Sequence, residues 1–403
     1  MKRFTCRLGL LVALSIPAEA ANREIRALFQ PDPSQPNKNV FINQTPNSGY
    51  CATYPEQCAS NNIFSIQLPV RFSSRRFLAS SEGIPLKVPA NWRQLTVTNA
   101  LTQEAETVEV RITGIGSNFI LSDSAADLTG VTDILEGHQK LWLRNSWVYA
   151  APPCLYSGVG AYTSHTYRFF WKTPVEAVCF KMNLYRIPSI DFDTLDIAYE
   201  LRTPNPLGMS SGLYTGSLPY TLGPDGDFDL GGVMVPDDSN LTLDFVLDVQ
   251  HTLKVDLPPG GEKVALEPQG GWQQWIDGGR IPTAIFRDQL FYISASSRFK
   301  VMMQCNSTGG SRCKLYSAKG NTTEVETFLT LPNGIEGPGG GAVKLFKLLH
   351  NVWSGPFQPG HYLDRKEGSL RFEMPRDAIY SLLRPGFTDT LSGYVTVIWD
   401  SEV

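Results

Sequence analysis

Short runs of alternating apolar and polar residues recur along the chain, and turn residues separate them. The clearest run is Leu241-Thr-Leu-Asp-Phe, in which Leu241, Leu243 and Phe245 fall on one face of an extended strand. Similar runs predict strands over 63–70, 95–98, 107–115, 139–148, 166–171, 176–184, 197–201, 241–249, 263–266, 290–293, 299–304, 326–331, 342–348, 370–373 and 393–399. Helix is expected only in short pieces, for example near 125–135.

Composition agrees with this pattern. Gly and Pro number 35 and 28, while charged residues make up only 18% of the chain. Many short strands between Gly- and Pro-rich turns indicate an all-β protein of the sandwich type. A length of 403 residues exceeds one ordinary domain. The polar hexamer Val235-Pro-Asp-Asp-Ser-Asn240 then suggests a division into domains over 21–236 and 237–403.

The N-terminal residues have the features of an export signal. Lys2, Arg3 and Arg7 form a positively charged start, and an apolar stretch over 8–16 follows them. Ala18-Glu-Ala20 is an A-x-A cleavage site. Residues 1–20 are therefore predicted to be a signal peptide, and the mature protein is expected to be soluble and exported. The mild net charge of −4 gives no support to nucleic-acid binding.

Six of the seven cysteines follow the predicted signal peptide. An even number in an exported chain indicates disulfides, although six cysteines allow fifteen pairings. Short loops favour neighbours, which predicts the three pairs Cys51–Cys58, Cys154–Cys179 and Cys305–Cys313. A zinc site is the alternative, but there is no C-x-x-C pair and the five histidines are scattered.

Motifs of catalysis and metal binding are weak. Gly208-Met-Ser210-Ser-Gly212 matches a nucleophile elbow, but prolines precede it and a strand-like run follows where a helix is needed. The carboxylates of Asp225-Gly-Asp-Phe-Asp229 suit calcium, yet the distal Glu of an EF-hand is absent and a turn is favoured. Acidic residues show no spacing that singles out a general acid–base pair. We expect no enzyme activity, no cofactor and no metal.

The stretch 191–230 carries a family resemblance. Its pattern is formed by Pro204, Pro206, Leu207, Met209, Gly212, Tyr214, Gly216, Tyr220, Gly223 and Asp227-Phe-Asp229. This pattern resembles the tip adhesins of alternative chaperone–usher pili, of the colonization-factor and cable-pilus type. The resemblance implies two immunoglobulin-like β-sandwich domains in tandem, an N-terminal adhesin domain and a C-terminal pilin domain that is an incomplete sandwich.

The last predicted strand has apolar residues on both faces. Val395, Val397 and Trp399 lie on one face, with Tyr394 and Ile398 on the other. Composition alone is compatible with a central strand of a complete sandwich. The resemblance implies instead that this strand borders a groove, which a periplasmic chaperone fills first and the N-terminal donor strand of the next pilin fills later.

Arginines lie among aromatic residues in the first domain. The candidates are Arg75, Arg76, Arg144 and Arg168. Arginine binds carboxylates in a bidentate fork and aromatic rings stack on sugars, so this combination suits an acidic glycan. The alternative is ordinary β-sheet composition with arginine outside. The resemblance places receptor binding in this domain only as a region.

These observations predict a minor fimbrial tip subunit, exported through the periplasm to the cell surface. It would bind a host-surface receptor such as a glycan, and its partners would be a chaperone, an outer-membrane usher and the next pilin. Two alternatives stay open: a structural initiator of the fibre without a ligand, and an exported carbohydrate-active enzyme.

Overall fold

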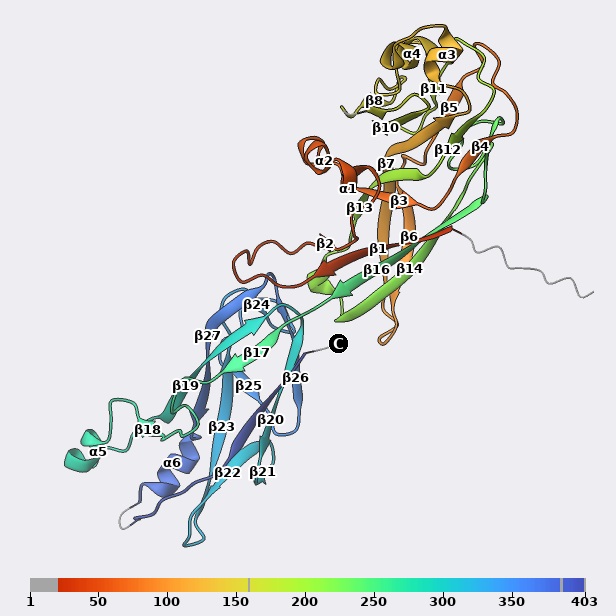
Figure 1. Ribbon diagram of the computed structural model, residues 1–403. Helices are drawn as coiled ribbons and strands as arrows, with labels where there is room; N and C mark the ends of the chain where they lie inside the picture. Colours follow the sequence, from red (N-terminus) through yellow and green to blue (C-terminus); the bar gives the residue numbers. More distant parts are fainter. Residues whose placement is uncertain (1–20, 159, 385–386, 402–403) are drawn as a thin grey trace, which may run out of the picture.

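The computed structural model describes residues 21–158, 160–384 and 387–401. The signal peptide predicted over 1–20 lies outside the described residues. Figure 1 shows an elongated molecule with two lobes, one built from residues up to 249 and the other from residues after 252. We refer to residues 21–249 as the first unit and to residues 253–401 as the second unit. Strands dominate both, which confirms the all-β prediction.

Fourteen strands of the described residues form one curled sheet in the first unit. Its main path runs β15-β4-β12-β7-β6-β14-β16-β1-β2, and β5 pairs separately with β11. The elements are β1 (Ala21–Phe29), β2 (Ile42–Asn43), α1 (Tyr50–Thr53), α2 (Pro55–Asn61), β3 (Ser65–Leu68), β4 (Phe72–Ser74), β5 (Ile84–Leu86), β6 (Arg93–Asn99), β7 (Ala105–Leu121), α3 (Ala125–Thr129), α4 (Ile134–Leu141), β8 (Leu155–Tyr156), β9 (Ala161–Tyr162), β10 (Thr166–Lys172), β11 (Cys179–Lys181), β12 (Ile190–Phe192), β13 (Leu195–Arg202), the 3-10 turn η1 (Pro206–Gly208), β14 (Gly212–Thr221), β15 (Met234–Pro236) and β16 (Asn240–Val249).

Strand β7 is the spine of this sheet, since it pairs in turn with β6, β13, β10 and β12. The alternation of its sequence puts Val108, Val110 and Ile112 into the core with no exposed surface. Further along β7, the paired strand β10 lies so close that a Cβ on Gly116 would be 2.5 Å from the carbonyl oxygen of Phe169. Glycine is therefore required there for the close approach of two strands.

Strand β16 differs from the domain division expected from sequence. It pairs in parallel with β1, from Ala21 opposite Leu241 to Phe29 opposite Val249, and antiparallel with β14. Its inward residues Leu241, Leu243 and Phe245 lie in the core of the first unit. The predicted alternation is present, but the strand expected to open the second domain belongs to the first sheet. Sequence cannot show that the N-terminal strand supplies a partner more than 200 positions away.

The second unit is a sandwich of two sheets. The larger runs β17-β19-β27-β23-β22-β21 with β18 and β25 attached, and the smaller runs β24-β26-β20-β28. The elements are β17 (Leu253–Asp256), β18 (Glu267–Pro268), α5 (Gln273–Gly278), β19 (Ile285–Ala295), β20 (Phe299–Cys305), β21 (Thr308–Gly309), β22 (Arg312–Tyr316), β23 (Thr322–Thr330), β24 (Ile335–Glu336), β25 (Phe346–Leu348), β26 (Trp353–Pro359), β27 (Leu363–Glu373), α6 (Arg376–Leu382) and β28 (Val395–Ser401).

Between these sheets lies a compact apolar core. Phe291 and Ile293 of the larger sheet meet Phe299, Val301 and other residues of the smaller sheet. The same alternation that marked these strands in the sequence places one face of each sheet against the other.

Local signals explain the short helices, and two predicted strands are absent. Ser124 accepts a hydrogen bond from the N–H of Asp127, and Asp133 accepts one from that of Glu136, so each side chain caps the start of a helix. Helix α4 runs to Leu141 and turns follow it, so the strand predicted over 139–148 is wrong. The strand predicted over 263–266 is wrong too, because that stretch is irregular and only Glu267–Pro268 pair there. Apolar spacing in that stretch belongs to the buried face of a helix and to a packed loop. The helical piece expected near 125–135 is confirmed.

All three predicted disulfides form. Cys51 joins Cys58, Cys154 joins Cys179 and Cys305 joins Cys313. The middle bond ties the loop before β8 to β11, two segments that no short turn connects. Each bond closes a loop of the unfolded chain, which stabilises a fold by about 2–4 kcal/mol.

Candidate functional site

Strand β28 lies at one edge of the smaller sheet in the second unit. It pairs antiparallel with β20, from Phe299 opposite Ser401 to Cys305 opposite Val395. Within the described residues, no strand pairs with the other edge of β28. The backbone groups on that edge are therefore in position to pair with a strand from outside.

Apolar side chains follow this free edge on the side of the core. Val395, Val397 and Trp399 pack against the core of the second unit but stay partly exposed. The ring centroid of Trp399 lies 5.1 Å from that of Phe291 and 5.9 Å from that of Phe299. The paired neighbour β20 is different, because its own core-facing residues are fully buried. The core is thus closed over β20 and less completely closed over β28.

The facing sheet ends at the same side with β17. Leu253 and Val255 of β17 also pack against the core while keeping part of their surface exposed. Two edge strands, one from each sheet, therefore leave apolar surface along one flank of the sandwich. We call this flank, formed by Leu253, Val255, Val395, Val397 and Trp399, the open flank.

The sequence assigned five residues to a strand-accepting groove, and the structure separates them. Val395, Val397 and Trp399 face the core on the open flank. Ile398 is half-buried on the opposite face of β28. Tyr394 precedes the strand and is 79% exposed, and its backbone N–H donates to Oδ1 of Asn306 at 3.2 Å.

The four candidate arginines do not form one cluster. Arg75 and Arg144 are exposed. Arg76 is also exposed, but it forms an ion pair with Glu82. Arg168 is different, since its side chain is only 17% exposed and it pairs with a carboxylate that has no exposed surface. Only part of the predicted set thus presents a free guanidinium to a ligand.

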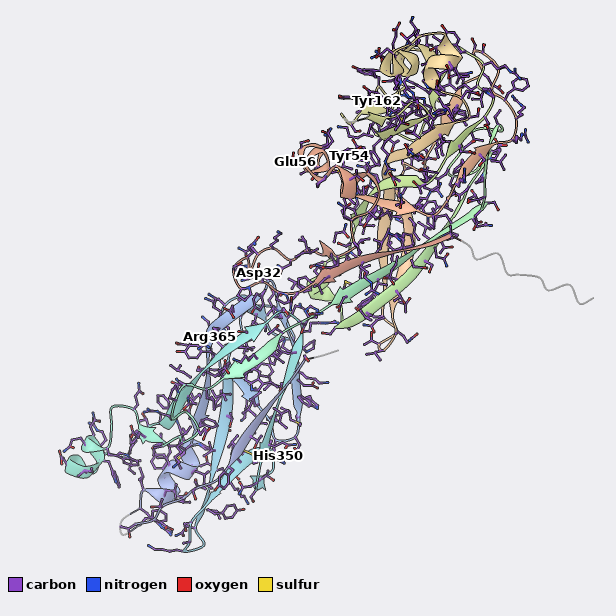
Figure 2. The ribbon with its side chains drawn as sticks, viewed as in Figure 1. Asp32, Tyr54, Glu56, Tyr162, His350 and Arg365 are labelled. Atoms are coloured by element: carbon purple, nitrogen blue, oxygen red, sulfur yellow. A yellow bond between two sulfur atoms is a disulfide. The ribbon has the colours of Figure 1, made fainter. Side chains whose placement is uncertain are left out.

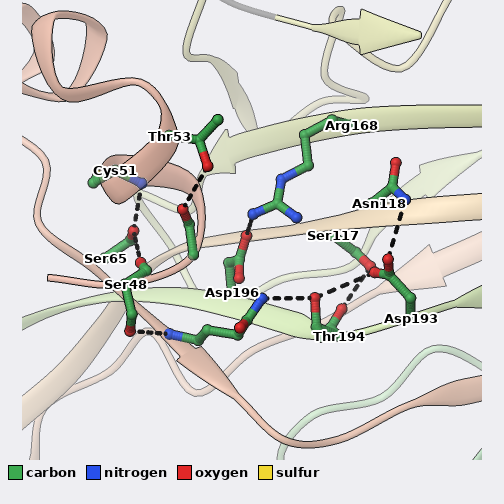
Figure 3. Close-up of polar contacts among 12 residues, drawn as sticks. Ser48, Cys51, Thr53, Ser65, Ser117, Asn118, Arg168, Asp193, Thr194 and Asp196 are labelled. Carbon is green, nitrogen blue, oxygen red and sulfur yellow. Dashed lines mark hydrogen bonds and ion pairs between the residues drawn. The ribbon is translucent and has the colours of Figure 1, made fainter. Parts of the chain in front are cut away.

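Arg168 belongs to a buried polar cluster between β10, β13 and the segment before β3. Figure 3 shows its guanidinium directed at Asp196, with Asp193, Asn118 and Ser117 close by. Gly49 lies against the carboxylate, because a Cβ there would be 2.3 Å from Oδ1 of Asp196. Burial raises the pKa of Asp196 to about 6, against the opposite effect of Arg168. This geometry suits a link within the fold better than a contact with a receptor.

One further arginine was missed in the sequence. Arg186 lies 4.2 Å from the ring centroid of Phe77 in a cation–π contact. The bridge between Leu78 and Ile187 brings these residues together. No short spacing relates residues 77 and 186, so pattern reasoning had no signal for the pair.

Part of the stretch that carries the family resemblance, around η1 and the start of β14, lies at the end of the first unit nearest the second. The N–H of Ser210 donates to the hydroxyl of Tyr214 at 2.9 Å, and that hydroxyl donates to Glu104. Nε2 of His251 lies 2.9 Å from the carbonyl oxygen of Met209, and its Nδ1 lies 3.1 Å from Oγ of Ser296 in the second unit. Met209 and its neighbours in the signature therefore contribute to the junction between the units, whereas Tyr220 and Asp227-Phe-Asp229 lie toward the far end of β14.

The 225–229 motif, considered above for calcium, makes contacts within the fold. Asp227 pairs with Arg93 at 2.6 Å and accepts the N–H of Thr221, while Asp229 accepts the N–H of Asp225. These are the contacts of a turn. The carboxylates of Asp227 and Asp229 are thus engaged within the turn.

Histidines are spread over both units. Figure 2 labels His350 in the second unit, where Nδ1 accepts the N–H of Cys305 at 3.1 Å, and Tyr162 at the other end of the molecule. The part of the chain that the structure describes holds no group of three His, Cys, Asp or Glu side chains suited to a metal ion. None of its helices is long and apolar enough to cross a membrane.

A shallow cavity of about 210 Å³ lies beside β1 and β13. Tyr199 contributes to it, but its hydroxyl donates to Oγ1 of Thr45 at 3.0 Å and so is already engaged. The cavity holds no charged side chain in its lining, which consists of Ala27, Phe41, Asn43, Tyr199, Leu201 and Thr203.

Comparisons with known proteins give structural neighbours alone. No family model matches the chain, and a search of curated proteins finds no relative. The adhesive subunit CfaE of CFA/I fimbria from enterotoxigenic Escherichia coli is 9% identical, with a TM-score of 0.24, over 95% of this chain and 98% of that one. A chain of a CFA/I chaperone–tip adhesin complex is 10% identical, with a TM-score of 0.25, over 95% of this chain and 97% of that one. A chain of the CsuC–CsuE chaperone–tip adhesin complex of Acinetobacter baumannii is 10% identical, with a TM-score of 0.23, over 94% of this chain and 98% of that one.

The chain is thus similar, along nearly its whole length, to tip adhesins of chaperone–usher fimbriae. Identities of 9–10% and TM-scores of at most 0.25 are too low for this likeness to support an argument about function.

Proposed function

We propose that this protein is a fimbrial tip subunit whose second unit accepts a β-strand from another polypeptide. The observation that carries this proposal is the open flank, where the unpaired edge of β28 coincides with partly exposed apolar side chains of β17 and β28. A strand added beside β28 would satisfy the backbone groups of that edge and cover Val397 and Trp399 at once.

The family resemblance in the 204–229 stretch implies which partners supply the strand. A periplasmic chaperone would occupy the open flank first, and the N-terminal strand of the next pilin would replace it at the usher. Such a subunit has to be exported, in agreement with the predicted signal peptide. Without a partner the second unit should aggregate, since its apolar flank is open to other chains.

Thermal unfolding of the full chain with synthetic peptides tests this proposal. The peptides alternate Val or Ile with polar residues, and a control peptide has prolines at two central positions and therefore lacks the required N–H groups. A peptide present at a hundredfold excess over its Kd stabilises the folded state by about 2.7 kcal/mol. For a domain of this size, that corresponds to a rise in Tm of roughly 5–10 °C.

Two variants of β28 sharpen the test. Val397→Asp places a charge on the face toward the core and should abolish the response to the peptide. Thr396→Asp changes the neighbouring exposed position and should retain it. An unchanged Tm with all peptides, in a chain that stays monomeric, would contradict strand acceptance.

We further propose that the first unit binds a host-surface receptor such as a glycan. Arg75 and Arg144 are the supported candidates because both are exposed, whereas Arg76 and Arg168 are held by Glu82 and Asp196. Screening the full chain on a glycan array tests this part, with Arg75→Ala and Arg144→Ala as variants. A chain that accepts strands but retains no glycan would be a structural initiator. Release of sugar from mucin would instead favour the carbohydrate-active enzyme.

A further inference from the structure

The segment over 178–184, which contains β11, has its apolar and polar faces reversed. Val178, Phe180 and Leu184 are 47%, 42% and 42% exposed, and Met182 between them is half-buried. The alternate residues Lys181 and Asn183 are 2% and 0% exposed. A strand on the surface of a protein normally buries the first set and exposes the second. We call Val178, Phe180, Met182 and Leu184 the apolar stripe.

This reversed register is fixed by specific bonds to the inward face. Nζ of Lys181 donates to the carbonyl oxygens of Ser146 and Tyr149 at 3.0 and 2.9 Å. Asn183 accepts the N–H of Gly83 at 2.7 Å and donates to the carbonyl oxygen of Ala79 at 2.8 Å. Cys179 is held by its disulfide to Cys154. A slip by one residue would bury the stripe, but it would break all of these bonds.

Neighbouring segments widen the stripe into a patch. The N–H of Leu143 donates to the carbonyl oxygen of Met182 at 2.8 Å, and Leu143 itself is 43% exposed. The N–H of Leu78 donates to the carbonyl oxygen of Ile187, which brings Phe77, also 43% exposed, alongside Arg186. Contiguous apolar surface of this kind marks an interaction site in a soluble protein.

The charge beside the patch is positive. Arg144 follows Leu143, and Arg186 continues the outward positions of the stripe. Among the described residues, neither arginine has a carboxylate within ion-pair distance. Two acidic side chains lie close to this segment: Glu82 is paired with Arg76, and Glu176, two positions before Val178, accepts the N–H of Asn91 at 3.0 Å. The occupant of the patch should therefore combine an apolar body with negative charge.

We propose that the apolar stripe, with Phe77, Leu143, Arg144 and Arg186, docks onto the surface of an anionic lipid bilayer. A sugar stacks on aromatic rings but gains little from Val178, Met182 and Leu184, which are aliphatic or flexible. The boundary between headgroups and acyl chains accepts such side chains, and arginines beside them pair with lipid phosphates. Figure 1 shows β5 and β11 near the end of the first unit that is farthest from the second unit. The patch therefore stays accessible when the open flank is occupied.

Flotation of the full chain with vesicles tests this inference, which does not depend on strand acceptance. Vesicles of phosphatidylcholine with phosphatidylglycerol should retain the protein at low salt, and phosphatidylcholine alone should retain it weakly. Arg144→Ala should weaken binding to the anionic vesicles roughly fivefold. Leu184→Ser should lower binding by a similar factor, and Val178→Ser with Leu184→Ser by more than tenfold.

The matched control is Leu101→Ser, which removes an 83% exposed apolar side chain in the turn between β6 and β7 and should not alter binding. Peptide-induced stabilisation of the second unit should be the same in every variant, so failure here is distinguishable from failure of strand acceptance. Equal binding to neutral and anionic vesicles, retention of binding by the double variant, or absence of vesicle binding would each overturn the proposal. Stripe-dependent binding of a soluble sialylated sugar in place of vesicles would identify a glycan as the occupant and overturn it too.

Discussion

Replacing Arg168 by alanine gives a direct measure of what this arginine does. The change leaves the carboxylate of Asp196 without its ion-pair partner in a position with no exposed surface. Removing one member of a buried ion pair costs about 3–5 kcal/mol, because the remaining charge stays buried. In a unit of this size each kcal/mol lowers Tm by roughly 2–4 °C, so Arg168→Ala should lower Tm by about 10 °C.

Near-UV circular dichroism is the suitable assay, because four tryptophans lie in the first unit and two of them stack with ring centroids 5.0 Å apart. The double variant Arg168→Ala with Asp196→Asn is the control, since it removes both charges and should recover much of the loss. A change in Tm below 2 °C for Arg168→Ala would refute the structural role. Loss of receptor binding at unchanged stability would instead identify Arg168 as a direct contact.

Three further predictions follow from single contacts. Folding raises the pKa of Asp196 from 3.8 to about 6, so the stability that this carboxyl contributes is fully present below pH 3.8 and is lost as the pH rises through about 6. Asp196→Asn should remove this part of the pH dependence, which urea unfolding from pH 4 to 8 would measure. Gly116→Ala should destabilise the first unit by roughly 1–3 kcal/mol in the same assay, because the added Cβ meets the carbonyl oxygen of Phe169. A urea midpoint equal to that of the unchanged protein would contradict the close packing of β7 on β10. His251→Phe removes the contact with Ser296, so proteolysis between the units should become faster, while an unchanged rate would show that this bond does not hold the junction.

Local features of the sequence were reliable where the physics is local. Cys51 pairs with Cys58 and Cys305 with Cys313, because the short chain between each pair keeps the two thiols close together. Alternating runs such as 107–115 and 299–304 became strands of matching phase. The stretch 139–148 failed because apolar residues at a helix end and in a packed loop resemble a strand pattern when the partner elements are unknown.

Site residues were predicted less well than strands. The arginines were chosen for the aromatic residues beside them in the sequence, but ion pairing depends on residues far away. Arg168 meets Asp196, and Arg186 meets Phe77, across large separations. Likewise, the 204–229 signature carried the family resemblance, but it gave no sign that its Met209 contacts His251 at the junction.

By itself, the sequence determined the all-β class, the phase of most strands and the three disulfides, since these depend on residue type and short-range spacing. Tertiary structure alone decided that β16 pairs with β1, that β28 has an unpaired edge, and that the apolar stripe over 178–184 faces outward. The reason is physical. A strand pattern specifies two faces, but which face is buried and which edge is paired depends on partners brought together only when the whole chain folds.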